Sequence, residues 1–388
     1  MSRQHRSAAV TASLLGAAAA AIYGAAAIQH WFPVPAERIL DDAARTLAST
    51  GGDADGTALP LFVHVSDALW LQPIPVYLTA AALKLLNGTT AAPRLIAAGI
   101  AAISVALTYL ATRRLLESER TGVIAAVLLA LTPAHLLYGS TATTPIYSVP
   151  FVLVWLLCVF PERKSPARFA TLAAGVVLGA GTYTNPEAVW TMAGFCVLTL
   201  AVLARDRNHR AAILLTTGFL VALLPLVPWF TAHPASYIDT MGRWAVHPAH
   251  IRNPIEGLGT FFRYDVFARR LSLYWDFFSP RHLFFTPQAS ALVWTGGVLL
   301  WPLLFFVPVG VYQLLSAEPR PRRVAILGGL LIPPIASATF DEQRSIAGCV
   351  TLLPFAAMAA ALGIEALLQI RWIHSFTVSQ RSRTPELR

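Results

Sequence analysis

The sequence predicts an all-α integral membrane protein of about ten transmembrane helices, and three observations lead to this. Of its 388 residues, 56% are hydrophobic and only 13% are charged. The apolar residues come in runs of about 18 or more, the length that a helix needs to cross roughly 30 Å of hydrocarbon. The 27 prolines and 24 glycines fit membrane helices, because neighbouring helices satisfy the backbone groups that such residues free.

Ten apolar runs are expected to be spans. The first follows "MSRQHRS" and also resembles a signal peptide, but it is longer than the usual apolar core of about 7–15 residues, so we expect a retained span. The expected spans are residues 8–30, 95–116, 121–139, 146–160, 169–184, 188–204, 211–230, 290–316, 324–340 and 346–369.

An eleventh apolar stretch, "LQPIPVYLTAAALKLL" at residues 71–86, is shorter than the ~20 residues of a span and holds two prolines and Lys84. The positive-inside rule decides its place. With ten spans and both termini in the cytoplasm, most arginines fall inside. We therefore expect residues 71–86 to form an interfacial helix on the outer face.

This topology divides the chain into four parts and places function between two long outer segments. The parts are an N-terminal transmembrane module (1–230, with the first outer loop at 31–93), an outer segment with interfacial helices (231–289), C-terminal transmembrane helices (290–370) and a cytoplasmic tail (371–388).

The sequence has no P-loop and no GxGxxG after a strand, which excludes the common nucleotide-binding enzymes.

The net charge and the cysteines argue against a nucleic-acid-binding protein and against a cysteine motif. The formal net charge is +9, but the basic residues form short clusters between spans, so no nucleic-acid partner is expected. The three cysteines lie in or beside apolar runs without a CxxC, as packing residues do. His247 and His250 are separated by a proline, which makes metal-ligand spacing unreliable. No cofactor is expected, and a divalent metal is left open.

The stretch "PAERILDDAARTL", residues 35–47, puts Glu37, Asp41 and Asp42 directly after the first span. A partly desolvated carboxylate there would serve as a general base toward an acceptor hydroxyl. The simpler interpretation is a solvated loop that keeps the first hairpin outside.

The second outer segment mixes arginines with many aromatic residues. Guanidinium groups pair with phosphate in bidentate geometry, so a phosphate clamp is one interpretation. An ordinary membrane-interface helix is the other. Nearer the last span, Arg344 and Glu342 in "FDEQRSIAGCV" either contact an anionic substrate group or pair with neighbouring charges. The clamp candidates are Arg263, Arg269, Arg270 and Arg281.

The order of these features resembles the GT-C superfamily of membrane glycosyltransferases that use polyprenyl-phosphate-linked sugars, in the branch of protein O-mannosyltransferases and aminoarabinose transferases. "PAERILDDAARTLASTGGD" resembles its acidic motif, although the usual Asp-Glu pair reads Ala36-Glu37 here. "ALWLQPIPVYLTAAALKLLNGTTAAPRL" is similar to its proline-rich helix, with Arg94 opening the second span. "GTYTNPEA", "YWDFFSPRHLFF" and "DEQRSIAGCVTLLPFAAMAAALG" resemble its later turn, its Phe-Ser-Pro loop and the start of its last span.

The resemblance implies an inverting sugar transfer on the outer face of a bacterial inner membrane. Arginines would hold the phosphate of the polyprenyl-phosphate sugar, and an acid of the first outer loop would activate the acceptor, which is a protein, a lipid or a glycan. Glu37 is the first choice as base, because it stands at the motif position, followed by Asp42 and Asp41. Arg94 and Tyr183 join the predicted substrate-binding residues.

Two other functions stay open. A GT-C-fold protein that has lost catalysis would bind a polyprenyl lipid or a partner subunit, because fold does not fix function. A transporter of lipid-linked sugars would show internal repeats and charges at the bilayer midplane. The sequence has no internal repeat, and its ionisable residues gather at one face.

Overall fold

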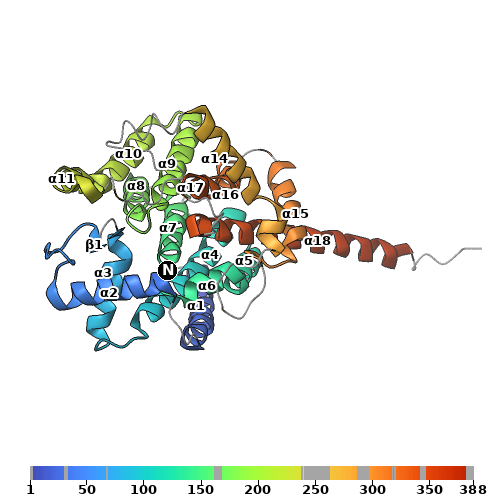
Figure 1. Ribbon diagram of the computed structural model, residues 1–388. Helices are drawn as coiled ribbons and strands as arrows, with labels where there is room; N and C mark the ends of the chain where they lie inside the picture. Colours follow the sequence, from blue (N-terminus) through green and yellow to red (C-terminus); the bar gives the residue numbers. More distant parts are fainter. Residues whose placement is uncertain are drawn as a thin grey trace, which may run out of the picture.

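The computed structural model describes residues 3–29, 34–66, 69–160, 168–236, 239, 263–285, 297–316, 318, 320–340 and 347–381, and these are predominantly helical. The predicted all-α class is confirmed (Figure 1). A short antiparallel hairpin, β1 (Val63–Ser66) with β2 (Leu69–Leu71), lies in the first outer loop. The helices are α1 (Arg3–Gln29), α2 (Pro35–Thr50), α3 (Pro73–Leu85), α4 (Ala92–Leu116), α5 (Glu119–Leu131), α6 (Pro133–Ser140), η1 (Thr144–Ser148), α7 (Val149–Val159), α8 (Arg168–Gly181), α9 (Ala188–Arg205), α10 (His209–Leu223), α11 (Leu226–Ala232), α14 (Tyr264–Phe277), the π-helical turn η2 (Arg281–Phe285), α15 (Leu303–Ser316), α16 (Pro321–Leu331), α17 (Pro333–Phe340), η3 (Ala347–Leu352) and α18 (Leu353–Arg381).

Within the described part of the chain, five helical stretches are long and apolar enough to cross a membrane. A sixth is added if α5 and α6, which are bent by 62° at their junction, form one span. Several other predicted spans are shorter apolar helices, so the number of ten stays a prediction. The five stretches are Ser7–Ile28, Ala92–Leu116, Ala188–Arg205, His209–Ala232 and Val350–Gln369.

The bend between α5 and α6 has a local cause. Pro133 opens α6, and Thr132 before it has extended backbone angles (φ −65°, ψ 124°). A residue that precedes proline is pushed out of the helical region by the proline ring, so α5 has to end there. The predicted span at residues 121–139 is therefore a broken helix.

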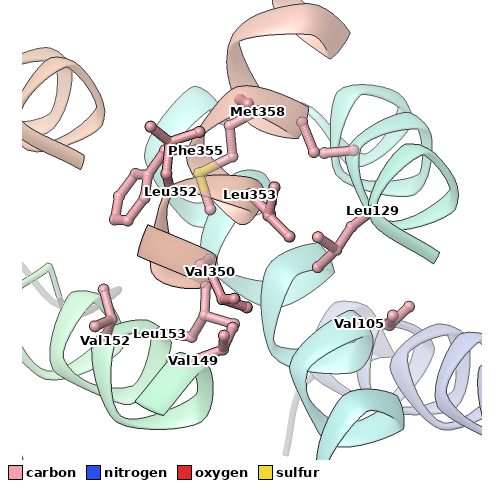
Figure 2. Close-up of a cluster of buried hydrophobic side chains, with 14 of the residues drawn as sticks. Val105, Leu129, Val149, Val152, Leu153, Val350, Leu352, Leu353, Phe355 and Met358 are labelled. Carbon is pink, nitrogen blue, oxygen red and sulfur yellow. The ribbon is translucent and has the colours of Figure 1, made fainter. Parts of the chain in front are cut away.

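The beginning of α18 lies in the centre of the core. Figure 2 shows Leu353, Phe355 and Met358 of α18 gathered with side chains of α4, α5 and α7, such as Leu129 and Leu153. All five of these side chains are fully buried. Because α18 contacts so many helices, it fixes the α4–α7 group and α15 relative to one another.

Small residues allow the closest helix contacts. A Cβ atom on Gly310 of α15 would lie 1.8 Å from the Ala359 carbonyl oxygen of α18, and one on Gly175 of α8 would lie 2.1 Å from the Leu215 carbonyl oxygen of α10. Membrane helices associate by such close packing, because lipid gives no hydrophobic drive for association. The crossings of α15 with α18 and of α8 with α10 therefore depend on glycine.

The first outer loop folds into a small unit at one end of the bundle. Its helices α2 and α3 pack through Leu40, Leu47, Val76 and Leu83. Figure 1 shows α2, α3, β1 and α11 on one side of the molecule, whereas α18 leads away on the opposite side. Within residues 71–86, which are too short for a span, Pro73–Leu85 form α3 of this unit and Leu71 ends β2. The predicted position at the membrane interface stays a prediction.

Replacing Gly310 by alanine is expected to lower the free energy of unfolding by about 1–3 kcal/mol, the usual cost of overpacking. The matched control is Gly99→Ala in α4, where an added Cβ meets nothing within 4 Å. That variant should be neutral or gain about 0.5–1 kcal/mol, because alanine suits a helix better than glycine. Thermal unfolding of the detergent-solubilised protein measures both. Equal unfolding temperatures would contradict the close crossing of α15 and α18.

Candidate functional site

The acidic helix α2 is anchored by a buried ion pair between Glu37 and Arg94. The helix begins at Pro35, after Val34 in extended conformation, and the Val34 amide donates to Oε2 of Glu37 at 2.9 Å. Arg94, near the start of α4, donates from Nε to Oε1 and from Nη2 to Oε2, each at 3.0 Å. This fork-to-fork geometry is the strongest form of a charge-assisted hydrogen bond. Glu37 is only 3% exposed.

The same carboxylate also reaches the loop that follows α6. The amide of Ala142 donates to Oε1 of Glu37 at 2.7 Å, and Nη1 of Arg94 donates to the carbonyl of Ala27 at 3.4 Å. One carboxylate and one guanidinium thus join the end of α1, the start of α2, the start of α4 and the loop after α6. A buried charge is tolerated only when it is paired and hydrogen-bonded, and here it is both.

These contacts determine the acidity of Glu37. Burial by itself raises the pKa of the Glu37 carboxyl, but the hydrogen bonds from Arg94, Ala142 and Val34 outweigh burial and hold the pKa below its ordinary value of 4.5. Each oxygen accepts two hydrogen bonds, which occupies the usual acceptor sites of a carboxylate. Such a group is a weak proton acceptor. These contacts hold the start of α2 in place, and the predicted role of Glu37 as base stays a prediction.

The other two acids of α2 lie in different surroundings. Asp41 follows Glu37 by about one helical turn, and its Oδ2 accepts from Nε of Arg45 at 3.0 Å. Its Oδ1 is buried and has no hydrogen-bond partner among the described residues. Asp42 is exposed. Asp41 thus lies on the same side of α2 as Glu37. One of its oxygens has no hydrogen-bond partner among the described residues.

Tyr183 holds the first outer loop against the bundle. Its carbonyl accepts from the amide of Ile74 in α3 at 3.3 Å, and its hydroxyl donates to the carbonyl of Ala222 in α10 at 2.8 Å. The side chain is largely buried. The predicted role in substrate binding stays a prediction, and the contacts in hand are structural.

An aromatic cluster, which the sequence analysis missed, joins the loop at residues 31–93 to α11. Phe62 stacks on Phe230 with ring centroids 5.7 Å apart, and Trp70 of β2 meets Trp229 edge-on at 6.3 Å. Nε1 of Trp70 donates to Oδ2 of Asp239 at 3.1 Å. The only signal in the sequence was the presence of aromatic residues in both segments, because their pairing depends on tertiary structure.

The predicted clamp arginines form a group apart from the Glu37–Arg94 pair. Arg263 and Arg269 are exposed on α14, and Arg281 is exposed on η2. Arg270 is half-buried, and burial lowers the pKa of its guanidinium. Figure 1 shows α14 in the upper part of the molecule, beside α17, and α2 at the lower left. Arg344 and Glu342 lie outside the described residues.

Among the residues that the structure describes, no three His, Cys, Asp or Glu side chains cluster in a way that would hold a metal ion. The expectation that the protein needs no cofactor stays a prediction.

Similar proteins share the fold with this chain. A profile of the family described as dolichyl-phosphate-mannose-protein mannosyltransferase matches residues 72–231. No curated protein matches the sequence. The crystal structure of ArnT from Cupriavidus metallidurans bound to undecaprenyl phosphate superposes with a TM-score of 0.58 and 14% identity, over 91% of this chain and 60% of that one. The archaeal oligosaccharyltransferase AglB from Archaeoglobus fulgidus, in complex with an inhibitory peptide and a dolichol-phosphate, gives 0.57 and 15%, over 97% and 52%.

The predicted GT-C fold is therefore confirmed by these structures together with the profile match. At such low identity the structural likeness concerns the fold alone. This chain also spans only 60% of ArnT and 52% of AglB, so the activity of neither protein transfers to it directly.

Removal of the Glu37 charge, as in Glu37→Gln, is expected to destabilise the protein by about 3–5 kcal/mol near neutral pH, because it leaves Arg94 buried without its counter-charge. The folded-state pKa of Glu37 is depressed, so the ion pair contributes its stability above pH 4.5 and loses it as the pH falls through the lower folded value. The difference between wild type and variant should thus be constant above pH 4.5 and shrink below it.

Thermal unfolding across this pH range measures that difference. Asp42→Asn is the control, because an exposed carboxylate should change stability little at any pH. If the stability difference between wild type and Glu37→Gln stayed the same below pH 4.5, the negative charge of Glu37 would not be the source of the stabilisation.

Proposed function

We propose that this protein transfers a sugar from a polyprenyl-phosphate carrier to an acceptor hydroxyl at the outer face of a bacterial inner membrane. The observation that carries the proposal is the acidic helix α2, fixed to a GT-C-like bundle by the buried Glu37–Arg94 pair. ArnT binds undecaprenyl phosphate and AglB binds a dolichol-phosphate, which supports a lipid carrier of this class.

In the proposed reaction, the acceptor oxygen attacks the anomeric carbon from the side opposite the phosphate. The new carbon–oxygen bond forms while the bond to the phosphate breaks, so the configuration inverts and the lipid phosphate leaves. A carboxylate of α2 takes the proton of the acceptor hydroxyl. General bases of this kind contribute typically about 10²–10⁴-fold to the rate.

Asp41 is the base that the contacts favour. Its Oδ1 keeps its lone pairs uncommitted, whereas both oxygens of Glu37 are occupied. In this assignment Glu37 and Arg94 act as positioning residues, because they hold the helix that carries Asp41. Preorganised placement of a catalytic group is a large part of what an enzyme supplies.

The phosphate would be held by arginines. Arg270 is one candidate, because a half-buried guanidinium pairs with phosphate more strongly than one in water. The phosphate is bonded to the sugar that Asp41 would serve, so this assignment requires α14 and α2 to approach each other when the donor binds. Arg94, Arg263, Arg269, Arg281 and Arg344, together with Tyr183 and Glu342, are the other predicted substrate contacts. The proposed orientation has both termini in the cytoplasm, from the arginine distribution.

A second function is favoured by Ala36. The acidic motif of the GT-C proteins that this chain resembles has an Asp before the Glu, and this chain has alanine there. A protein with the fold and without that carboxylate would bind a lipid carrier or a partner subunit and would not transfer sugar.

Asp41→Asn is expected to lower sugar transfer by about 10²–10⁴-fold without changing folding, because it removes the proton acceptor and keeps the shape of the side chain. The measurement is transfer from labelled polyprenyl-phosphate hexoses in membranes that contain the protein. Asp42→Asn is the matched control on the exposed side of α2 and should transfer at nearly the wild-type rate.

Two outcomes of this assay count against the assignment. Wild-type transfer by Asp41→Asn would put the base elsewhere. If the unmodified protein transfers no sugar but Ala36→Asp does, the second function leads.

Arg270→Ala is expected to weaken binding of the polyprenyl-phosphate donor by about 1.5–3 kcal/mol, the value of hydrogen bonds to a charged group. Titration of the purified protein with an unlabelled polyprenyl phosphate measures the affinity. Arg205→Ala, an exposed residue at the end of α9, is the control for a general loss of positive charge. An unchanged affinity for Arg270→Ala would remove this residue from the clamp.

A further inference from the structure

Helix α14 carries an exposed apolar stripe that no other described element covers. Tyr264, Phe267, Leu271 and Trp275 are 87%, 46%, 45% and 62% exposed. They follow each other at intervals of three or four residues, so they lie along one side of the helix. Scattered exposed apolar residues are normal, but a continuous line of four on a single helix marks an interaction surface.

The rest of α14 has two other faces. Phe277 is buried and Tyr274 is half-buried, on the side where the helix packs against α17. Ser272 and Arg269 are exposed on a third, polar side. The helix therefore has a protein-facing side, an apolar side and a polar side.

The apolar stripe adjoins the side of the transmembrane bundle. The Tyr274 hydroxyl donates to the carbonyl of Leu331 at 3.1 Å, which places α14 beside the junction of α16 and α17 (Figure 1). Leu331 and Ile335 at that junction are themselves 48% and 39% exposed. In a membrane protein, apolar side chains exposed on a bundle contact lipid, so the stripe continues a lipid-facing surface.

We infer that α14 lies in the membrane–water interface, with its apolar stripe in the acyl chains and the side of Ser272 and Arg269 toward the headgroups. Tyrosine and tryptophan favour this depth because their rings are apolar with a polar end. Interfacial helices bury their apolar face about 5–10 Å below the headgroup boundary. The partner of this surface is the bilayer itself, and the inference does not depend on the proposed sugar transfer.

The experiment places an environment-sensitive fluorophore (NBD) on single cysteines of the full-length protein in lipid nanodiscs. The background replaces Cys158, Cys196 and Cys349 by alanine and must retain the elution profile of the wild-type protein. Leu271→Cys and Phe267→Cys probe the stripe. Ser272→Cys is the matched control, because it is the neighbour of Leu271 and lies on the polar side.

At both stripe positions the emission should shift to the blue. Nitroxide-labelled acyl chains should quench it by about half or more, because the probe sits about 5–10 Å below the headgroups. The probe at Ser272 should be quenched distinctly less. Equal, water-like emission at all three positions would overturn the inference. Blue-shifted emission at Leu271 that acyl-chain nitroxides do not quench would also overturn it, because a protein surface would then cover the stripe.

Discussion

A carboxylate buried at the edge of a helix bundle needs a counter-charge, and Arg94 supplies it for Glu37. The pair is more than a local contact, because the Ala142 amide and the Ala27 carbonyl complete it from two further segments. Removing either charge would leave the other buried alone, at a cost of several kcal/mol. The place of the acidic helix on the bundle therefore depends on this single ion pair, and so does any chemistry that the helix performs.

Around this anchor, weaker contacts complete the end of the molecule that carries α2 and α3. The apolar sides of α2 and α3 bury each other, the turn at Tyr183 ties α3 to α10, and the aromatic cluster of Phe62, Trp70, Trp229 and Phe230 joins the hairpin to the chain after α10. None of these contacts carries a charge. The ion pair fixes where α2 begins, and the apolar contacts fix how the rest of the loop lies on the bundle.

The division of roles among the acids follows from the same geometry. A carboxylate that accepts four hydrogen bonds is held firmly, whereas one with an oxygen that accepts none is less restrained. Glu37 and Asp41 stand about one turn apart on the same helix and meet these two descriptions. In the function that we propose, a helix with one fixed and one uncommitted carboxylate would combine positioning and proton transfer in a short segment.

The sequence by itself determined the fold class, the GT-C resemblance and the helical nature of residues 71–86, because run length, proline spacing and charge asymmetry are local properties of the chain. It also identified Glu37, Asp41 and Arg94 as candidate site residues. Only the tertiary structure decided what these residues do. Arg94 is 57 positions from Glu37 and Ala142 is 105 positions away, so no local pattern predicts that both donate to that carboxylate.

Other features of the structure also depend on contacts between segments that are far apart in the sequence. The break after Thr132 was encoded in Pro133, but the 62° between α5 and α6 is known only from the tertiary structure. Aromatic residues were evident in the sequence, yet the stacking of Phe62 on Phe230 needs the loop at residues 31–93 and α11 to be brought together. The mixture of arginines and aromatic residues in α14 was evident from the sequence. Which side of α14 faces α17, and which side stays exposed, was decided by packing.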